Sequence, residues 1–276
     1  MKQGWLAAVA MALLWASAAS AQEANWQFRW QKGQVLTYQA EHKTNVEEVA
    51  DGAKVTSASK LSVVKRWQVA DVDPKGNATL ELSLTSMRNE QTRPNGEVLL
   101  FDSAQPDKGT PELKAQMSKF IGTPLANLRI DIQGRVLEVK QGSASRYEAE
   151  PPFVVVFPAV AAKEGQGWLR PFNLTLDPPY GTGELLEATE RYRCTKIAVG
   201  KATLTVANQL KAMPANVKDQ VPLVQKLTEG QVIFDLQAGR VVDVQLNIDR
   251  TLMNHHGEGS SYHFQSWFTE RLLDVK

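Results

Sequence analysis

The chain has 276 residues, of which 43% are hydrophobic and 22% charged, with a formal net charge of +1 and a single cysteine. This apolar content is ordinary for a chain that buries a core, so wholesale disorder is excluded. The near-zero net charge argues against a nucleic-acid-binding protein, which usually carries a basic excess. The chain also lacks a polybasic run of the kind that binds anionic membrane surfaces.

The first 21 residues have the pattern of a secretory signal peptide. Lys2 precedes an apolar run from Trp5 to Ala16, and the small residues Ala19 and Ala21 follow it. A positive start, a short apolar run and a small-x-small end are typical of a cleavable export signal. The run is also shorter than the roughly 20 residues that span a bilayer. We therefore expect cleavage after Ala21, a periplasmic or secreted location, and no transmembrane segment in the mature chain.

Alternation of apolar and polar residues predicts strands over most of the mature chain. It is strict in residues 78–85 and 242–249, as in a strand with one dry and one wet face. Looser alternation covers residues 35–46, 54–72, 184–199, 202–210 and 262–272. Tight turns rich in glycine, asparagine and aspartate separate these segments, which predicts antiparallel pairing rather than βαβ units.

Two segments have helical spacing of their apolar residues instead. Residues 111–121 begin with a proline, which suits a first helical turn, and are followed by Gly122. Residues 214–228 contain Pro222, so we expect either one helix or two short turns there. The proline-rich residues 149–182 are expected to be mainly a connection, in which the apolar run Phe153–Phe157 is a candidate buried strand.

The two sides of this connection resemble one another. Residues 76–82 (GNATLEL) match residues 200–206 (GKATLTV), and a helical segment and a hairpin follow each of them. This similarity predicts an internal repeat, with halves of about residues 23–148 and 180–276. Chance similarity is the alternative, because glycine-turn patterns recur in any β protein. We expect one β-rich domain, residues 22–276, of the mainly β (α+β) class. Its long antiparallel strands form a curved sheet or half-barrel with one or two short helices.

A family resemblance rests on short segments along the chain. Phe28–Gly33 leading to Tyr38, Phe101–Ser103, and the hairpin Gly134–Val136 resemble exported bacterial proteins of a domain-of-unknown-function class (DUF6263-like). This resemblance implies an exported β protein and brings no catalytic residues with it. The order of strand, helix and hairpin is also similar to that of periplasmic lipoprotein carriers, which implies a sheet curled around a helix to hold an acyl chain.

The C-terminal histidines are the one candidate for metal chemistry. His255, His256 and Glu258 lie in one predicted hairpin tip, and His263 follows in the next strand. Imidazole and carboxylate groups suit zinc or a similar ion. The glycines on both sides of Glu258 predict a mobile tip, so a solvated turn without metal is the alternative.

Other residues with reactive or aromatic side chains have ordinary structural explanations. Cys194 has no partner for an internal disulfide, and the strand alternation around it predicts a buried, inert thiol. No nucleophile elbow or phosphate-binding glycine loop occurs, and the pair Glu47–Glu48 lies on a strand whose wet face normally carries charge. Trp67 and Trp267 are candidate ligand contacts, unless they pack beneath a loop or helix.

These patterns favour a non-catalytic exported protein of the cell envelope that binds an apolar or extended ligand, such as a lipid, or an envelope partner. We expect no cofactor. A metal-dependent hydrolase that uses the histidine cluster is the second hypothesis. A structural or assembly protein that pairs through exposed sheet edges is the third.

Overall fold

The computed structural model describes residues 26–160, 162–176 and 183–276. The predicted export signal lies outside these residues. Within the described ranges, no helix has the length and apolar character needed to cross a membrane.

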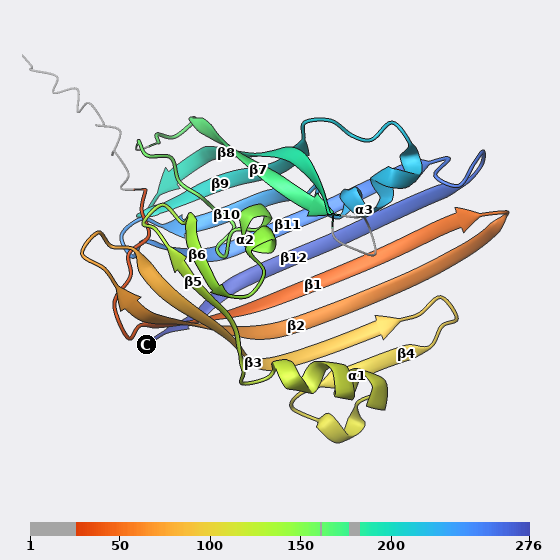
Figure 1. Ribbon diagram of the computed structural model, residues 1–276, viewed down its shortest axis with the longest axis horizontal. Helices are drawn as coiled ribbons and strands as arrows, with labels where there is room; N and C mark the ends of the chain where they lie inside the picture. Colours follow the sequence, from red (N-terminus) through yellow and green to blue (C-terminus); the bar gives the residue numbers. More distant parts are fainter. Residues whose placement is uncertain (1–25, 161, 177–182) are drawn as a thin grey trace, which may run out of the picture.

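The strands form one antiparallel, 12-stranded sheet that curves around its inner face (Figure 1). Their order is β6-β5-β3-β2-β1-β12-β11-β10-β9-β8-β7, and β4 pairs with β3 beside this path. The strands are β1 Val35–Ala50, β2 Ala53–Val72, β3 Ala78–Thr92, β4 Val98–Asp102, β5 Pro124–Ile130, β6 Val136–Gln141, β7 Gly167–Leu176, β8 Glu184–Ala198, β9 Lys201–Leu210, β10 Glu229–Asp235, β11 Arg240–Met253 and β12 Ser261–Val275. The predicted fold class is confirmed. The first and last strands, β1 and β12, pair at the centre, so both halves of the chain share one sheet.

Short helices lie in the connections between strands. The helix α1 Pro111–Met117, with the 3₁₀ turn η2 Ser118–Phe120, confirms the first predicted helix, and the 3₁₀ turn η1 Pro106–Lys108 precedes it. The second predicted segment is two short turns, η3 Val217–Gln220 and α3 Val221–Val224, because Pro222 has no N–H for a longer helix and occupies the first turn of α3. The helix α2 Ala144–Ala149 was not predicted from the sequence.

The expected connection 149–182 contains a strand, so that prediction is wrong for β7. Strand β7 pairs only with β8 among the described residues and carries Pro171, which has no N–H to donate to a neighbour. Proline is tolerated there because β7 lies at the edge of the sheet. The run Phe153–Phe157 is buried as expected, but it is a loop and not a strand: Val154 has a φ of 61°.

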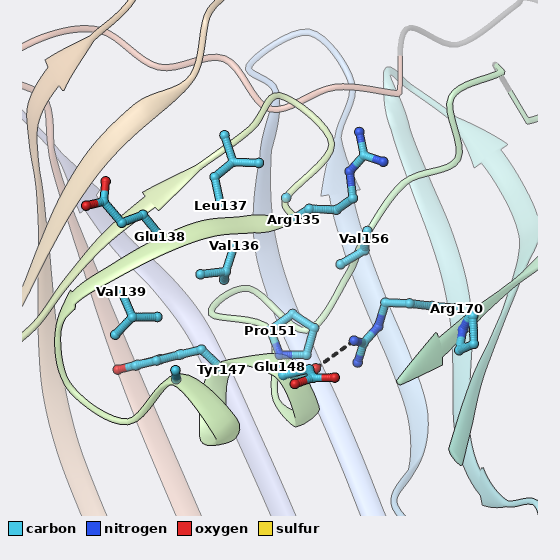
Figure 2. A pocket seen from close by; sticks show the side chains of 13 residues that line it. Arg135, Val136, Leu137, Glu138, Val139, Tyr147, Glu148, Pro151, Val156 and Arg170 are labelled. Carbon is cyan, nitrogen blue, oxygen red and sulfur yellow. Dashed lines mark hydrogen bonds between the residues drawn. The ribbon is translucent and has the colours of Figure 1, made fainter. Parts of the chain in front are cut away.

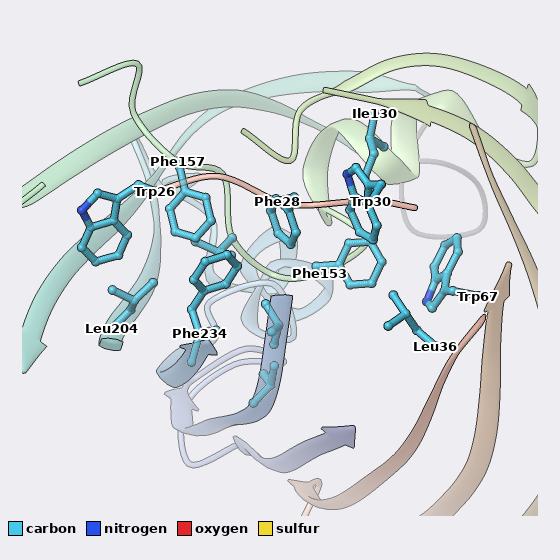
Figure 3. Close-up of a cluster of buried hydrophobic side chains, with 14 of the residues drawn as sticks. Trp26, Phe28, Trp30, Leu36, Trp67, Ile130, Phe153, Phe157, Leu204 and Phe234 are labelled. Atoms are coloured by element: carbon cyan, nitrogen blue, oxygen red, sulfur yellow. The ribbon is translucent and has the colours of Figure 1, made fainter. Parts of the chain in front are cut away.

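An N-terminal segment, residues 26–30, crosses the inner face and is called the plug below. The alternating side chains of Trp26, Phe28 and Trp30 are buried (Figure 3). Its backbone joins two hairpins that lie far apart in sequence: the N–H of Phe28 donates to Ile132 O at 2.7 Å, and that of Arg29 donates to Gly239 O at 3.0 Å. The plug therefore ties the β5–β6 turn to the β10–β11 turn.

The core between the sheet and the plug is filled by the protein's own aromatic side chains. Phe28 stacks on Trp30 with ring centroids 5.3 Å apart, and it also contacts Phe153, Phe157 and Phe234 (Figure 3). The hydroxyl of Tyr38 donates to Val241 O at 2.8 Å. Burial of apolar side chains stabilises this end of the sheet, as expected for a chain whose single cysteine cannot form an internal disulfide. Cys194 is fully buried, as predicted, and burial raises the pKa of its thiol.

Candidate functional site

A cavity lies where the two edges of the curved sheet approach one another without pairing. It has a volume of about 470 Å³ and lies between β6, α2 and β7 (Figure 2). This is within the range of roughly 300–1,000 Å³ that is usual for small-molecule sites. The lining residues are Gly134, Arg135, Val136, Leu137, Glu138, Val139, Ala144, Tyr147, Glu148, Pro151, Val156, Arg170 and Pro171.

The helix α2 forms one wall of the cavity because of its local sequence. Gly142 has a φ of 113°, which allows the chain to turn after β6, and the Ser143 hydroxyl accepts from Arg146 N as an N-cap. A Cβ at position 142 would lie 3.2 Å from the Tyr147 ring, so the glycine also lets this ring pack closely. The buried Ala149 attaches the last turn of α2 to the sheet.

Arg170 connects β7 to this helix. Its Nε donates to Glu190 Oε2 at 2.7 Å. Its two terminal nitrogens donate to the carbonyl of Glu148 at 2.7 Å (Figure 2) and to that of Ala149 at 3.2 Å. Glu190 also accepts a hydrogen bond from the Tyr192 hydroxyl. Burial raises the pKa of the Glu190 carboxyl despite the opposing effect of the guanidinium. Arg170 is thus a positioning residue of the cavity wall, with its charge already paired.

The other charged side chains around the cavity differ in whether an opposite charge lies beside them. Arg135 is bound by Asp131 at 2.7 Å, and Glu138 lies opposite Arg129 in the register of β5 and β6. Glu148 has no ion-pair partner among the described residues and accepts only long hydrogen bonds, of 3.4 Å, from Asn173. The uncompensated charge at this rim is therefore negative, next to an apolar wall of valine and proline side chains. Such a site suits a molecule with an apolar body and a neutral or cationic polar group.

The two candidate tryptophans lie away from this cavity. Trp67 is 2% exposed and packs on Phe153, with ring centroids 5.4 Å apart. Trp267 is 42% exposed on the outer face of the sheet, where it is paired in register with Lys43 and Asn247. The structure does not bring the two rings together, since they lie on opposite faces.

The candidate metal ligands separate into two groups. His255 and His256 meet Glu48 of β1: the Nε2 atoms lie 2.9 and 3.6 Å from Glu48 Oε1. His263 lies elsewhere, with its Nε2 2.8 Å from Asp249 Oδ1. Among the described residues, the triad Glu48, His255 and His256 is the group whose ligand atoms converge, and Glu258 is not part of it.

Sequence reasoning missed Glu48 as a partner of the histidines because the pairing depends on strand register. Glu48 lies opposite Tyr262 of β12, which places it near the β11–β12 turn, far along the chain. The cavity residues of β6 and α2 were missed as well. The one local signal for α2 was Gly142–Ser143, a turn residue followed by an N-cap residue.

Comparisons with known proteins identify no family for this chain. No protein-family profile matches it, and no curated protein does. The DUF6263-like resemblance therefore stays a prediction.

Solved structures with a similar arrangement include three of different kinds. Lipovitellin, from a study of its lipid–protein interactions, has a TM-score of 0.48 at 11% identity over 90% of this chain and 26% of its own. A DUF1329 family protein from Desulfovibrio piger has a TM-score of 0.18 at 10% identity, over 86% of this chain and 85% of its own. An outer membrane lipoprotein-sorting protein domain from Vibrio parahaemolyticus has a TM-score of 0.16 at 10% identity, over 86% and 84%. These TM-scores lie below 0.5, so the likenesses establish neither a shared fold nor a shared activity.

Proposed function

We propose that this protein is an exported, non-catalytic binding protein of the cell envelope that holds an apolar or amphiphilic small molecule in the cavity between β6, α2 and β7. The observation that carries the proposal is the cavity itself: about 470 Å³ between two unpaired sheet edges. The predicted export signal supports a periplasmic or secreted location.

The filled core determines where such a ligand binds. The plug and the loop Phe153–Phe157 occupy the space that a ligand inside the curved sheet would need. The cavity lies beside this core, and Val156 contributes to its lining from the same loop. One side of an apolar ligand body would lie against valine and proline side chains and lose contact with water, which stabilises binding by roughly 25 cal/mol per Å² of apolar surface buried.

The first experiment asks whether the protein carries a ligand. Protein purified without detergent from its own cells is analysed by native mass spectrometry, and a co-purifying small molecule is expected. Ala144→Trp places an indole in the cavity from an exposed position on α2 and is expected to abolish this adduct. Ala104→Trp, at an exposed position after β4, is the matched control and should retain it.

The second experiment tests the charge of the rim. By titration calorimetry, 1-dodecanol is expected to bind more tightly than dodecanoate, which has the same chain length and a negative head group. Glu148→Gln should narrow that difference, because it removes the rim carboxylate that has no ion-pair partner among the described residues. The proposal is overturned if no adduct is found and neither probe shows saturable binding. It is also overturned if Ala144→Trp binds the probes as tightly as the unsubstituted protein.

A further inference from the structure

We infer that Glu48, His255 and His256 form a binding site for one divalent transition-metal ion of the zinc, cobalt and nickel class. The site lies at the end of the sheet where the β11–β12 turn approaches the end of β1 (Figure 1). It shares no residue with the cavity between β6, α2 and β7, so its test is independent of the proposed function.

The spacing of the three ligand atoms suits such an ion. Ligand atoms that bind zinc at about 2.0–2.1 Å in a tetrahedron lie about 3.3 Å from one another. The separations from Glu48 Oε1 to His255 Nε2 and to His256 Nε2 are 2.9 and 3.6 Å, on either side of this value. All three ligand atoms lie within 4.8 Å of one another. Small rotations of the side chains would therefore complete three of the four positions of a tetrahedron.

The donor set selects the kind of ion. Two imidazoles and one carboxylate suit zinc and its neighbours in the first transition series, whereas calcium and magnesium prefer oxygen ligands alone. Three protein ligands leave a fourth position for water. The exposed fractions of the Glu48 and His256 side chains, 38% and 46%, leave the ligand atoms accessible to an ion from solvent.

The backbone holds both sides of the site in place. The turn between β11 and β12 is closed by hydrogen bonds from Asn254 N to Ser260 O at 2.7 Å and from His256 N to Ser260 Oγ at 2.9 Å. Asn254, Gly257 and Gly259 adopt the positive φ values that this tight path requires. Glu48 is fixed between Tyr262 and Val55 in the sheet. The glycines therefore belong to a hydrogen-bonded turn, in place of the mobile tip that the sequence suggested.

The burial of His255 is a second, independent observation. Its side chain is 1% exposed, yet its Nδ1 finds no hydrogen-bond partner among the described residues. Nε2, which faces Glu48 Oε1 at 2.9 Å, is the nitrogen that this buried ring presents to the site. A metal bond through Nε2 would connect the β11–β12 turn to β1.

The test uses the full protein without a histidine tag, stripped with EDTA and dialysed. Titration calorimetry with Zn²⁺, and visible absorption with Co²⁺, are expected to show one saturable site, and Zn²⁺ should raise the melting temperature. His256→Ala and Glu48→Gln change partly exposed side chains, so both variants should fold. Each is expected to weaken Zn²⁺ binding by at least about 100-fold. Losing a residue that only hydrogen-bonds to a ligand already costs about 10–100-fold, and both of these residues are direct ligands.

His263→Ala is the matched control, because it removes a nearby histidine that lies against Asp249 outside the triad. This variant should bind Zn²⁺ with the affinity of the unsubstituted protein. The inference is overturned by the absence of saturable binding, by unchanged affinity in His256→Ala or Glu48→Gln, or by an equal loss in His263→Ala.

Discussion

Polar residues on the inner face of the sheet show how the alternation rule fails at single positions. Lys65 and Glu270 lie in line with buried apolar neighbours, and their side chains form an ion pair of 2.8 Å with exposed fractions of only 23% and 6%. His42 lies farther along β1, where its Nε2 is 2.8 Å from Ser266 Oγ and its ring meets Phe268. Alternation places such residues on a face, but it does not say that the face is apolar throughout.

His42 makes stability depend on pH in a defined direction. Burial lowers the pKa of His42, while the Glu150 carboxylate opposes this shift. The folded state therefore favours the neutral ring, whereas the unfolded chain takes up a proton as pH falls below about 6.5. Stability is full above that pH and is lost as pH falls toward the lower folded pKa. Urea unfolding of the protein and of His42→Gln should show a smaller cost of the substitution at pH 5 than at pH 8. An equal or larger cost at pH 5 would contradict this assignment.

At the scale of elements, the turns after β5 and β10 are built alike and hold the plug between them. Asp131 Oδ1 accepts from Gln133 N and Asp235 Oδ1 accepts from Gln237 N, so an aspartate closes each turn. The strands were predictable because their periodicity is long and regular, and α1 because helical spacing continues through η2 to Phe120 between the flanking signals Pro111 and Gly122. The helix α2 has six residues, too few for a periodic signal, and depends on contacts with β6 and β7.

Gly134 is the point at which the β5–β6 turn meets the plug. Its φ is 89°, and a Cβ there would lie 2.6 Å from Phe28 Cε2 and 2.7 Å from Val155 O. Gly134→Ala should therefore lower the free energy of unfolding by about 2–5 kcal/mol, from backbone strain of about 1–2 kcal/mol and overpacking of about 1–3 kcal/mol.

Gly96→Ala separates these two effects. Gly96 has a φ of 81° in the turn before β4, and a Cβ at this position would meet no described atom within 4 Å. Chemical denaturation should show only the strain cost, about 1–2 kcal/mol. Equal losses in the two alanine variants would mean that the plug does not pack tightly on Gly134.

For the whole molecule, the decisive feature is how the two edges of one continuous sheet are held near one another. Strand β6 at one end of the order and β7 at the other both contact α2. Arg170 secures this arrangement through the two α2 carbonyls and Glu190. The same order of strand, helix and hairpin occurs in β3 to β6 and in β9 to β11, interrupted in the first half by β4. An internal repeat stays a prediction.

Arg170→Met should destabilise the protein by about 3–5 kcal/mol, because it leaves the Glu190 carboxylate, 4% exposed, without its cation. Adding Glu190→Gln should restore much of that loss, since the buried charge is then gone. Arg93→Met removes exposed pairs with Glu97 and Glu112 and should cost less than about 1 kcal/mol. Thermal and urea unfolding measure all three variants. A double variant as unstable as Arg170→Met would show that Arg170 acts through its α2 contacts instead.

The sequence by itself determined the fold class, most of the long strands, the helical segment at Pro111 and the buried character of Cys194. Each of these follows from local periodicity and turn chemistry, which act over a few residues. Only the tertiary structure decided that Glu48 meets His255 and His256, that Trp67 is core while Trp267 faces outward, and that a cavity remains between β6 and β7. These depend on strand register and on the curvature of the whole sheet, which residues far apart in the chain set together.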